Sequence, residues 1–486
     1  SSYLGHRIFA SQRHTSIHKS MENSKLRHLL RTFTIREWKS FRDFVNSPYF
    51  NRNREVTALF EWFAEQAPLL DDTSRLAAHA ALFPGQPFDE ARLNHLMSFL
   101  LKLGERFIGL EQSTTDGFFP EFHTLQALEA RDQEKHYRYI FEQKRKRLDL
   151  RERRDARYYL ENYLLENLEA NRINRSTTRS FNEHVQKSAD SLDAFYLTEK
   201  LRFTCYMLTS QIVIATPYNL QLVNEICRFI DTNSAPLEVP AIQAYYRIFK
   251  LLTLEDASDD FEALKILLKQ NDRFFSPEEL TELYQYAINF CNLQIMKGRE
   301  LYVAEALELY TEGIESGILL QDGFLSPWHF KNVIKLGLRL KKFEWTELFI
   351  LQNTSLLEAR FREDALYYNL AELYYYTGRS DEAMLQLTKV EFTDVHYNIG
   401  AKVMLSKIYF ETESLDALES LLHAFKSYLH RNKLIAEDLR RTYLNFIAML
   451  WKLVRTTPER YALLKEKMEK SQMIAEKNWL LRMMDT

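Results

Sequence analysis

Glycine and proline are scarce in this chain, and this scarcity is the strongest constraint on its fold. The 486 residues include 12 glycines and 11 prolines, about 2–3% each, against typical usage of roughly 7% and 5%. Tight turns, β-bulges and phosphate-binding loops need glycine because it adopts positive φ without strain. The composition therefore disfavours β-sandwiches, Rossmann folds and P-loop folds. It predicts an all-α protein whose helices are joined by short polar turns.

Charge and cysteine usage narrow the functional classes. The formal net charge of −3 gives no overall attraction to nucleic acid or to a membrane surface. The three cysteines, Cys205, Cys227 and Cys291, are too far apart for a disulfide framework or a zinc site. We therefore expect a reducing compartment, the cytoplasm. The sequence has no run of about 18 apolar residues, so no transmembrane span is expected.

Residues 1–20 are expected to be a disordered tail outside the fold. They contain Arg7, Arg13 and Lys19 and no acidic residue, which loosely resembles a transit peptide. They lack the apolar core of a secretory signal. Because Met21 opens a clean helical pattern, we expect the tail to be a cloning remnant or upstream translation.

Residues 22–118 are expected to form an N-terminal helical bundle. Thr34 and Glu37 have the spacing of a capping box, which predicts that a helix begins directly after Thr34. Ser47 and Pro48 end that helix, because the residue before a proline is driven out of the α region.

The middle region, residues 120–235, is expected to contain long helices. The stretch from His123 to Arg172 has no glycine or proline. Its pattern predicts either one very long helix or two helices joined at a bend near Asp149. Residues 144–157 within it are strongly basic.

Residues 240–486 show marked helix starts and a repeat. Ser276-Pro277 and Ser326-Pro327 each place an N-cap residue before a proline at the first helical position, and Thr457-Pro458 repeats this arrangement. Proline is thus used where helices begin, and no sheet is expected in this region.

The clearest repeat lies in residues 365–390. Tyr367, Leu370, Ala371 and Tyr374 share one helical face, which predicts a core stripe. The small residues expected where paired helices approach closely are Ala371 and Ala383, and Gly378 suits a helix C-cap.

This pattern of aromatic, leucine, small residue and tyrosine, followed by a turn glycine, resembles the tetratricopeptide repeat. Weaker copies flank it: Leu405, Ser406 and Tyr409 follow 35 residues later, and Phe330 lies 37 residues before Tyr367. Lys402 stands where the family has an aromatic residue, and the closing proline is absent after Val390. The resemblance implies an α-solenoid of antiparallel helix pairs, and a plain helical bundle remains the alternative.

No motif for catalysis, cofactor binding or metal binding stands out. The chain has no G-x-G-x-x-G, no G-x-x-x-x-G-K-[ST] and no G-x-S-x-G sequence, and it has no Glu-x-x-His pair. Glu419 and His423 share a helix face and form a metal half-site at most. We therefore expect a non-enzymatic protein that has no cofactor and binds a protein or peptide partner.

The resemblance also implies where that partner binds. In tetratricopeptide proteins the groove is lined by positions beside the core stripe of each first helix. These positions are Lys331, Lys335, Tyr368, Glu372, Tyr375, Val403, Lys407 and Phe410. Because Tyr368, Glu372 and Tyr375 are offset from the core stripe, we expect replacement of both tyrosines to leave the core intact. The alternative is that the tyrosines serve in ordinary packing. Glu372 and the tyrosines replace much of the family's clamp for a peptide carboxylate, so an amphipathic peptide or helix is the expected ligand.

The alternative function is a regulator that contacts nucleic acid, with the repeats as its sensor. It rests on the basic N-terminal module and on the basic stretch of the middle region. The candidate residues are Arg145, Lys146, Arg147, Arg151 and Arg154. Acidic residues interrupt this stretch and weaken its attraction for phosphate.

Overall fold

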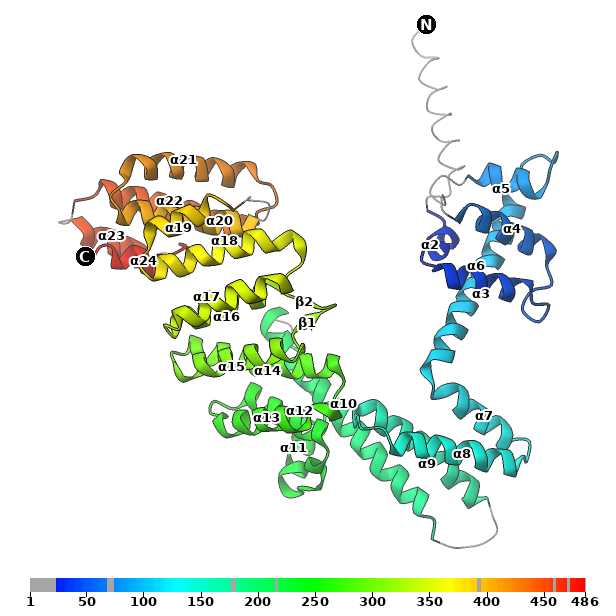
Figure 1. The fold of residues 1–486 in the computed structure, drawn as a ribbon. Helices are drawn as coiled ribbons and strands as arrows, with labels where there is room; N and C mark the ends of the chain where they lie inside the picture. Colours follow the sequence, from blue (N-terminus) through cyan, green and yellow to red (C-terminus); the bar gives the residue numbers. More distant parts are fainter. Residues whose placement is uncertain are drawn as a thin grey trace. The chain divides into compact units, whose positions relative to one another are not determined.

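The protein is all-α, as its composition predicts. The structure is a computed structural model that describes residues 23–67, 74–175, 181–214, 217–390, 395–457, 460–469 and 473–485. Helix accounts for 78% of the structure (Figure 1). The expected tail of residues 1–20 and the helix start at Pro458 lie outside the described residues.

The chain divides into two compact units. The first comprises residues up to Arg151 together with Glu161–Ser188, and the second comprises Glu152–Leu160 and the residues from Ala189 onward. Two helices contribute to both units: α9 (Ala156–Asn174) and α10 (Glu183–Ile214).

The first unit begins with a helical bundle. Its helices are α2 (Lys25–Arg31), α3 (Ile35–Asn46), α4 (Arg54–Glu65), α5 (Arg75–Leu82) and α6 (Glu90–Asp116). The predicted capping box is present at the start of α3: the Thr34 amide donates to Glu37 Oε2 at 2.7 Å, and the Glu37 amide donates to Thr34 Oγ1 at 3.2 Å. The other helices of the bundle pack on α6, and fully buried Phe41 and Phe60 lie at their centre.

The expected long helix of the middle region is three helices. These are α7 (Phe119–Glu129), α8 (Glu134–Asp149) and α9. The bend predicted near Asp149 is present, but a second break at Asp132 was not predicted. Asp132 adopts φ of 54°, a left-handed conformation that aspartate tolerates better than most residues do. A break of this kind needs neither glycine nor proline, so the sequence pattern did not reveal it.

The second unit continues with helices that pack as consecutive pairs. These helices are α11 (Val223–Thr232), α12 (Pro240–Thr253), α13 (Ser258–Asn271), α14 (Pro277–Met296), α15 (Leu301–Glu315), α16 (Pro327–Arg339), α17 (Phe343–Asn353), α18 (Ala359–Tyr376), α19 (Ser380–Leu387), α20 (Val395–Glu411), α21 (Leu415–Arg431), α22 (Glu437–Arg455), α23 (Tyr461–Glu469) and α24 (Lys477–Arg482). Short 3₁₀ turns lie at η2 (Ala235–Glu238), η3 (Asp272–Phe274) and η4 (Thr354–Leu356). From α12 to α23 each even-numbered helix packs on the odd-numbered helix that follows it.

One turn geometry recurs between the paired helices. Gly298, Lys341, Gly378 and Glu413 follow α14, α16, α18 and α20, and each has φ between 54° and 81°. In each turn the next residue donates its amide to a carbonyl five residues earlier, at 2.8–3.0 Å. This is the Schellman arrangement that satisfies carbonyls at a helix C-terminus. The same closing turn therefore forms with or without glycine.

A small β-hairpin corrects the expectation that this region contains no sheet. Strand β1 (Leu320–Gln321) pairs antiparallel with β2 (Phe324–Leu325) between α15 and α16. Asp322 and Gly323 turn the hairpin with positive φ of 51° and 82°. An aspartate followed by a glycine is a strong hairpin signal, so this pair could have been found in the sequence.

The paired helices are built on two hydrophobic clusters, and both include residues of α20. One hydrophobic cluster runs from Leu197 of α10 to Ile408 of α20, and another covers the helices from α20 to α24. Ala371 and Ala383, expected where paired helices approach closely, are both fully buried between α18 and α19.

Candidate binding grooves

Two grooves in the second unit are candidates for binding a ligand. The first, here called the α16–α20 groove, has a volume of about 560 Å³. It is lined by Trp328, Lys331, Lys335, Leu338, Arg339, Tyr368, Glu372, Tyr375, Tyr376, Ile399, Gly400, Val403, Met404, Lys407, Tyr443 and Glu476. Seven of the eight residues proposed from the sequence thus lie around one groove, and Phe410 is the exception.

Helix α16 supplies the basic side of this groove. Ser326 caps the helix by accepting from the Trp328 amide at 3.3 Å. Lys331 Nζ lies 4.9 Å from the centre of the Tyr368 ring. Lys335 is exposed, and it forms no ion pair with any described residue. It therefore presents a charge that a ligand can reach.

Helix α18 supplies Tyr368, which has a packing role as well. Its exposed fraction is 6%, and its ring lies edge-on to Tyr397 at 5.3 Å. Burial raises the pKa of Tyr368 well above its usual value. Tyr367, expected in the core stripe, is only half-buried. The buried face of α18 is thus rotated towards Tyr368 from the face that the sequence predicted.

Glu372 is the polar group of the groove with unused bonding capacity. Its Oε2 atom is buried and has no hydrogen-bond partner among the described residues. Lys335 and Lys407 line the groove together with Glu372. Lys407 Nζ pairs instead with Glu476 Oε2 at 3.0 Å. An unpartnered buried oxygen is costly, so this carboxylate is held in place at the expense of stability.

Residues from the C-terminal end of the chain close one side of the groove. The Tyr375 hydroxyl donates to Glu411 Oε1 at 2.7 Å, and Trp479 Nε1 donates to the same oxygen at 2.7 Å. Phe410 packs on Trp479 with ring centres 5.6 Å apart and does not itself line the groove. Sequence reasoning missed Glu476 and Trp479, because no local pattern connects them with α18 or α20.

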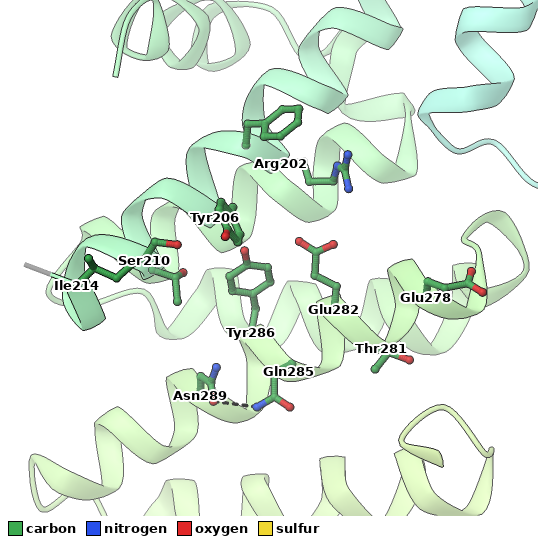
Figure 2. A pocket seen from close by; sticks show the side chains of 12 residues that line it. Arg202, Tyr206, Ser210, Ile214, Glu278, Thr281, Glu282, Gln285, Tyr286 and Asn289 are labelled. Atoms are coloured by element: carbon green, nitrogen blue, oxygen red, sulfur yellow. Dashed lines mark hydrogen bonds between the residues drawn. The ribbon is translucent and has the colours of Figure 1, made fainter. Parts of the chain in front are cut away.

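The second groove, here called the α10–α14 groove, was not predicted from the sequence. Its volume is about 800 Å³ (Figure 2). It is lined by Arg202, Phe203, Tyr206, Thr209, Ser210 and Ile214 of α10 and by Glu278, Thr281, Glu282, Gln285, Tyr286 and Asn289 of α14. Exposed aromatic residues on α10 are a possible sequence signal for this groove. The helix that forms the other wall, α14, lies far away in the sequence, so no local pattern connects the two.

Two half-buried acidic residues, Glu279 and Glu282, lie on α14 at this groove. Burial raises the pKa of the Glu282 carboxyl, and Arg202 opposes that shift. Burial also raises the pKa of Glu279 to about 7, with Asp155 adding to the shift. Glu279 stands three residues after the N-cap residue Ser276, which is the position of a capping-box acid. The Ser276 side chain does accept from the Glu279 amide at 3.1 Å, but the Glu279 carboxyl faces Tyr245 and Asp155.

The basic residues of the nucleic-acid alternative are largely engaged in internal contacts. Arg145 pairs with Glu166 at 2.6 Å, Arg147 with Glu121 at 2.6 Å and Arg151 with Glu161 at 3.2 Å. The Arg154 guanidinium, in the second unit, stacks on the Tyr158 ring at 4.1 Å. Lys146 is exposed. These ion pairs reduce the positive charge available to phosphate.

The part of the chain that the structure describes shows neither a cluster of metal ligands nor a membrane-spanning helix. Within the described ranges, no group of three or more His, Cys, Asp or Glu side chains is placed to hold a metal ion. Likewise, no described helix is both long and apolar enough to cross a membrane. Comparison with protein families, curated proteins and solved structures found no match.

Proposed function

We propose that this protein is a non-enzymatic interaction scaffold whose second unit is a tetratricopeptide-like helical repeat. The observation that carries the proposal is the convergence of seven sequence-selected residues on one groove across α16, α18 and α20. Repeat arrays of helix pairs bind partners on the surface formed by successive first helices. The recurring turn after α14, α16, α18 and α20 supports such an array.

The proposed ligand is an amphipathic peptide or helix. The groove offers aromatic surface at Tyr375 and Tyr376 and a basic edge at Lys335. Aromatic anchors supply binding energy, while charges set register and specificity. The Glu372 carboxylate lines the groove, and it would accept a hydrogen bond from a basic or amide side chain of the ligand.

The proposed setting is a reducing compartment such as the cytoplasm. The three cysteines are free thiols, and Cys205 and Cys291 are buried. Burial raises the pKa of both of these thiols, which makes them poor nucleophiles and supports a packing role for them.

Site-specific photocrosslinking in the native cell tests the proposal. A benzophenone amino acid would replace Tyr376 or Trp328, which line the groove. The matched controls are Leu385 on α19 and Leu348 on α17, which are outside the lining. Tyr376 is 58% exposed and Leu385 57% exposed, so accessibility does not distinguish the two positions.

We expect one adduct of defined mass from the two groove positions and none from the control positions. Adducts that form equally at all four positions, or only at the controls, would show that partners bind elsewhere. The purified variants should keep the wild-type circular dichroism spectrum, since every substituted side chain is exposed.

A further inference from the structure

The α10–α14 groove carries an inference about a second ligand. One edge of it is formed by Phe203, Tyr206 and Ile214, which are large, exposed and carried by the same helix. Neighbouring exposed apolar side chains on a folded protein mark interaction sites more often than isolated ones do. Figure 2 shows Tyr286 of α14 directed towards Tyr206 of α10 across the groove.

The walls of the groove are held in place by the core. On α10, Leu201 and Cys205 are buried on the side away from the groove. The Cys205 thiol donates to the carbonyl of Tyr245 on α12 at 3.4 Å. On α14, Leu283 and Ala287 are fully buried. The groove therefore exists before any ligand arrives, which lowers the entropic cost of binding.

The charged groups of the groove are predominantly acidic. Glu278 and Glu282 face it from α14, a helix that contains no lysine or arginine. Among the described lining residues the cation is Arg202, which pairs with Glu199 at 2.8 Å and also attracts the Glu282 carboxylate. Figure 2 shows the Glu282 carboxylate extending from α14 towards α10.

The neutral polar groups of the lining are largely satisfied within the protein. The Thr281 hydroxyl donates to the Ile318 carbonyl at 2.7 Å, and Gln285 Nε2 donates to Asn289 Oδ1 at 2.9 Å. The lining groups that attract a positively charged ligand are the carboxylates of Glu278 and Glu282, and Tyr286 already donates a hydrogen bond to Glu282. A ligand that matches this groove combines apolar surface with positive charge.

We infer that the α10–α14 groove is a docking site for a cationic amphipathic segment of another protein. Its apolar side chains cover Phe203, Tyr206 and Ile214, and a lysine or arginine reaches Glu282. Aromatic faces beside the carboxylate add cation–π attraction. The 12 residues from Phe203 to Ile214 span about 16 Å of helix, which matches a partner helix of roughly three turns. No residue of this groove lines the α16–α20 groove, so the inference does not depend on the proposed function.

Selection from a displayed library of random 16-residue peptides on the intact chain tests this inference. Enriched peptides are expected to combine lysine or arginine with bulky apolar residues. Their affinity should fall at least tenfold in Glu282→Lys and in Tyr206→Ser. It should be unchanged in Glu315→Gln, an exposed acid on α15, and in Tyr376→Ser of the other groove. Tyr206 is exposed, so its variant stays informative even if Glu282→Lys folds poorly.

The docking site is overturned by any of three results. These are the absence of enriched peptides, enrichment of acidic or uncharged peptides, and enriched peptides whose affinity is the same in Tyr206→Ser. Peptides lost only in Tyr376→Ser would locate binding in the α16–α20 groove, which would support the proposed function and contradict this inference.

Discussion

Gly400 of α20 lies directly against the ring of Tyr368 of α18. A Cβ atom at position 400 would be 2.7 Å from the tyrosine Oη and 2.8 Å from its Cε2. Distances below about 3 Å require one group to move, and the Tyr368 ring is itself buried against Tyr397. The absence of a side chain at Gly400 therefore fixes both the spacing of two successive helices and the floor of the α16–α20 groove.

Gly400→Ala should destabilise the protein by about 1–3 kcal/mol, because the added methyl overpacks this contact. The matched control is Gly109→Ala on α6, where a Cβ would meet no atom within 4 Å. That exposed helical position should gain about 0.5–1 kcal/mol from the better helix propensity of alanine. Denaturant unfolding of both variants measures the opposite signs. A stabilised Gly400→Ala would mean that α18 and α20 are not packed as described.

Ala383→Leu should also cost roughly 1–3 kcal/mol. Ala383 is fully buried where α19 packs on α18, so three extra heavy atoms have no space. Leu385→Ala on the same helix is the control, since Leu385 is exposed and its change should stay within about 0.5 kcal/mol. An unchanged unfolding midpoint for Ala383→Leu would contradict the close approach of the two helices.

The turn that closes the first helix of a pair can be read from the sequence where a glycine forms it, as at Gly298 and Gly378. Gly378 closes α18 with positive φ, and a glycine in that position is visible in a sequence. Lys341 and Glu413 close α16 and α20 with the same geometry. This left-handed conformation costs a non-glycine residue about 1–2 kcal/mol. Favourable packing around the turn can offset that cost. A repeat that keeps the turn but not the glycine therefore leaves only a weak signal in the sequence.

The candidate sites could be predicted only where one helix defines them. The groove positions on α16, α18 and α20 follow from helical spacing within each helix. The rotation of α18 about its axis depends on the helices that pack around it. As a result Tyr368 is buried and Tyr367 is half-buried, the reverse of what helical spacing predicted. Glu476 reaches Lys407 from 69 residues away, and no local pattern predicts such a contact.

Stability should depend on pH through Glu279. Its pKa is about 7 in the folded protein against 4.5 as the ordinary value. The folded state therefore binds more protons than the unfolded state between those values, and stability falls as pH rises from about 4.5 to about 7. The groups that set this pKa are Asp155, Tyr245, Arg202 and Glu282, acting together with burial.

Glu279→Gln should remove this loss, which is up to roughly 3 kcal/mol, and should flatten the profile of unfolding free energy against pH. Glu278→Gln is the control, because Glu278 is exposed at the adjacent position. If both variants keep the wild-type slope across this window, the Glu279 carboxyl is ionised in the folded state and the described burial is wrong.

Nucleic-acid binding should be weak, sensitive to salt and without sequence preference. Arg145, Arg147 and Arg151 are paired with internal glutamates, which lowers the number of phosphates that they can neutralise. Fluorescence anisotropy with a labelled duplex and a labelled single strand measures this. Lys146→Glu should weaken the residual binding further, because Lys146 is exposed. Tight, sequence-selective binding at physiological salt would favour the regulator over the scaffold.

Tyr368 and Tyr376 should separate packing from binding in the α16–α20 groove. Tyr368 is buried against Tyr397 and Gly400, so Tyr368→Ser should cost about 3–5 kcal/mol, as other deletions of buried aromatic rings do. Tyr376 lines the same groove but is exposed, so Tyr376→Ser should change stability by no more than about 0.5 kcal/mol. Tyr376→Ser should nevertheless reduce the adduct formed by a crosslinker at Trp328, because it removes apolar contact area and keeps the fold.

Urea unfolding and adduct yield are measured on the same preparations. A Tyr376→Ser variant of native stability that gives the full adduct yield would remove this residue from the binding surface. A Tyr368→Ser variant as stable as the wild type would show that the tyrosine is not part of the core.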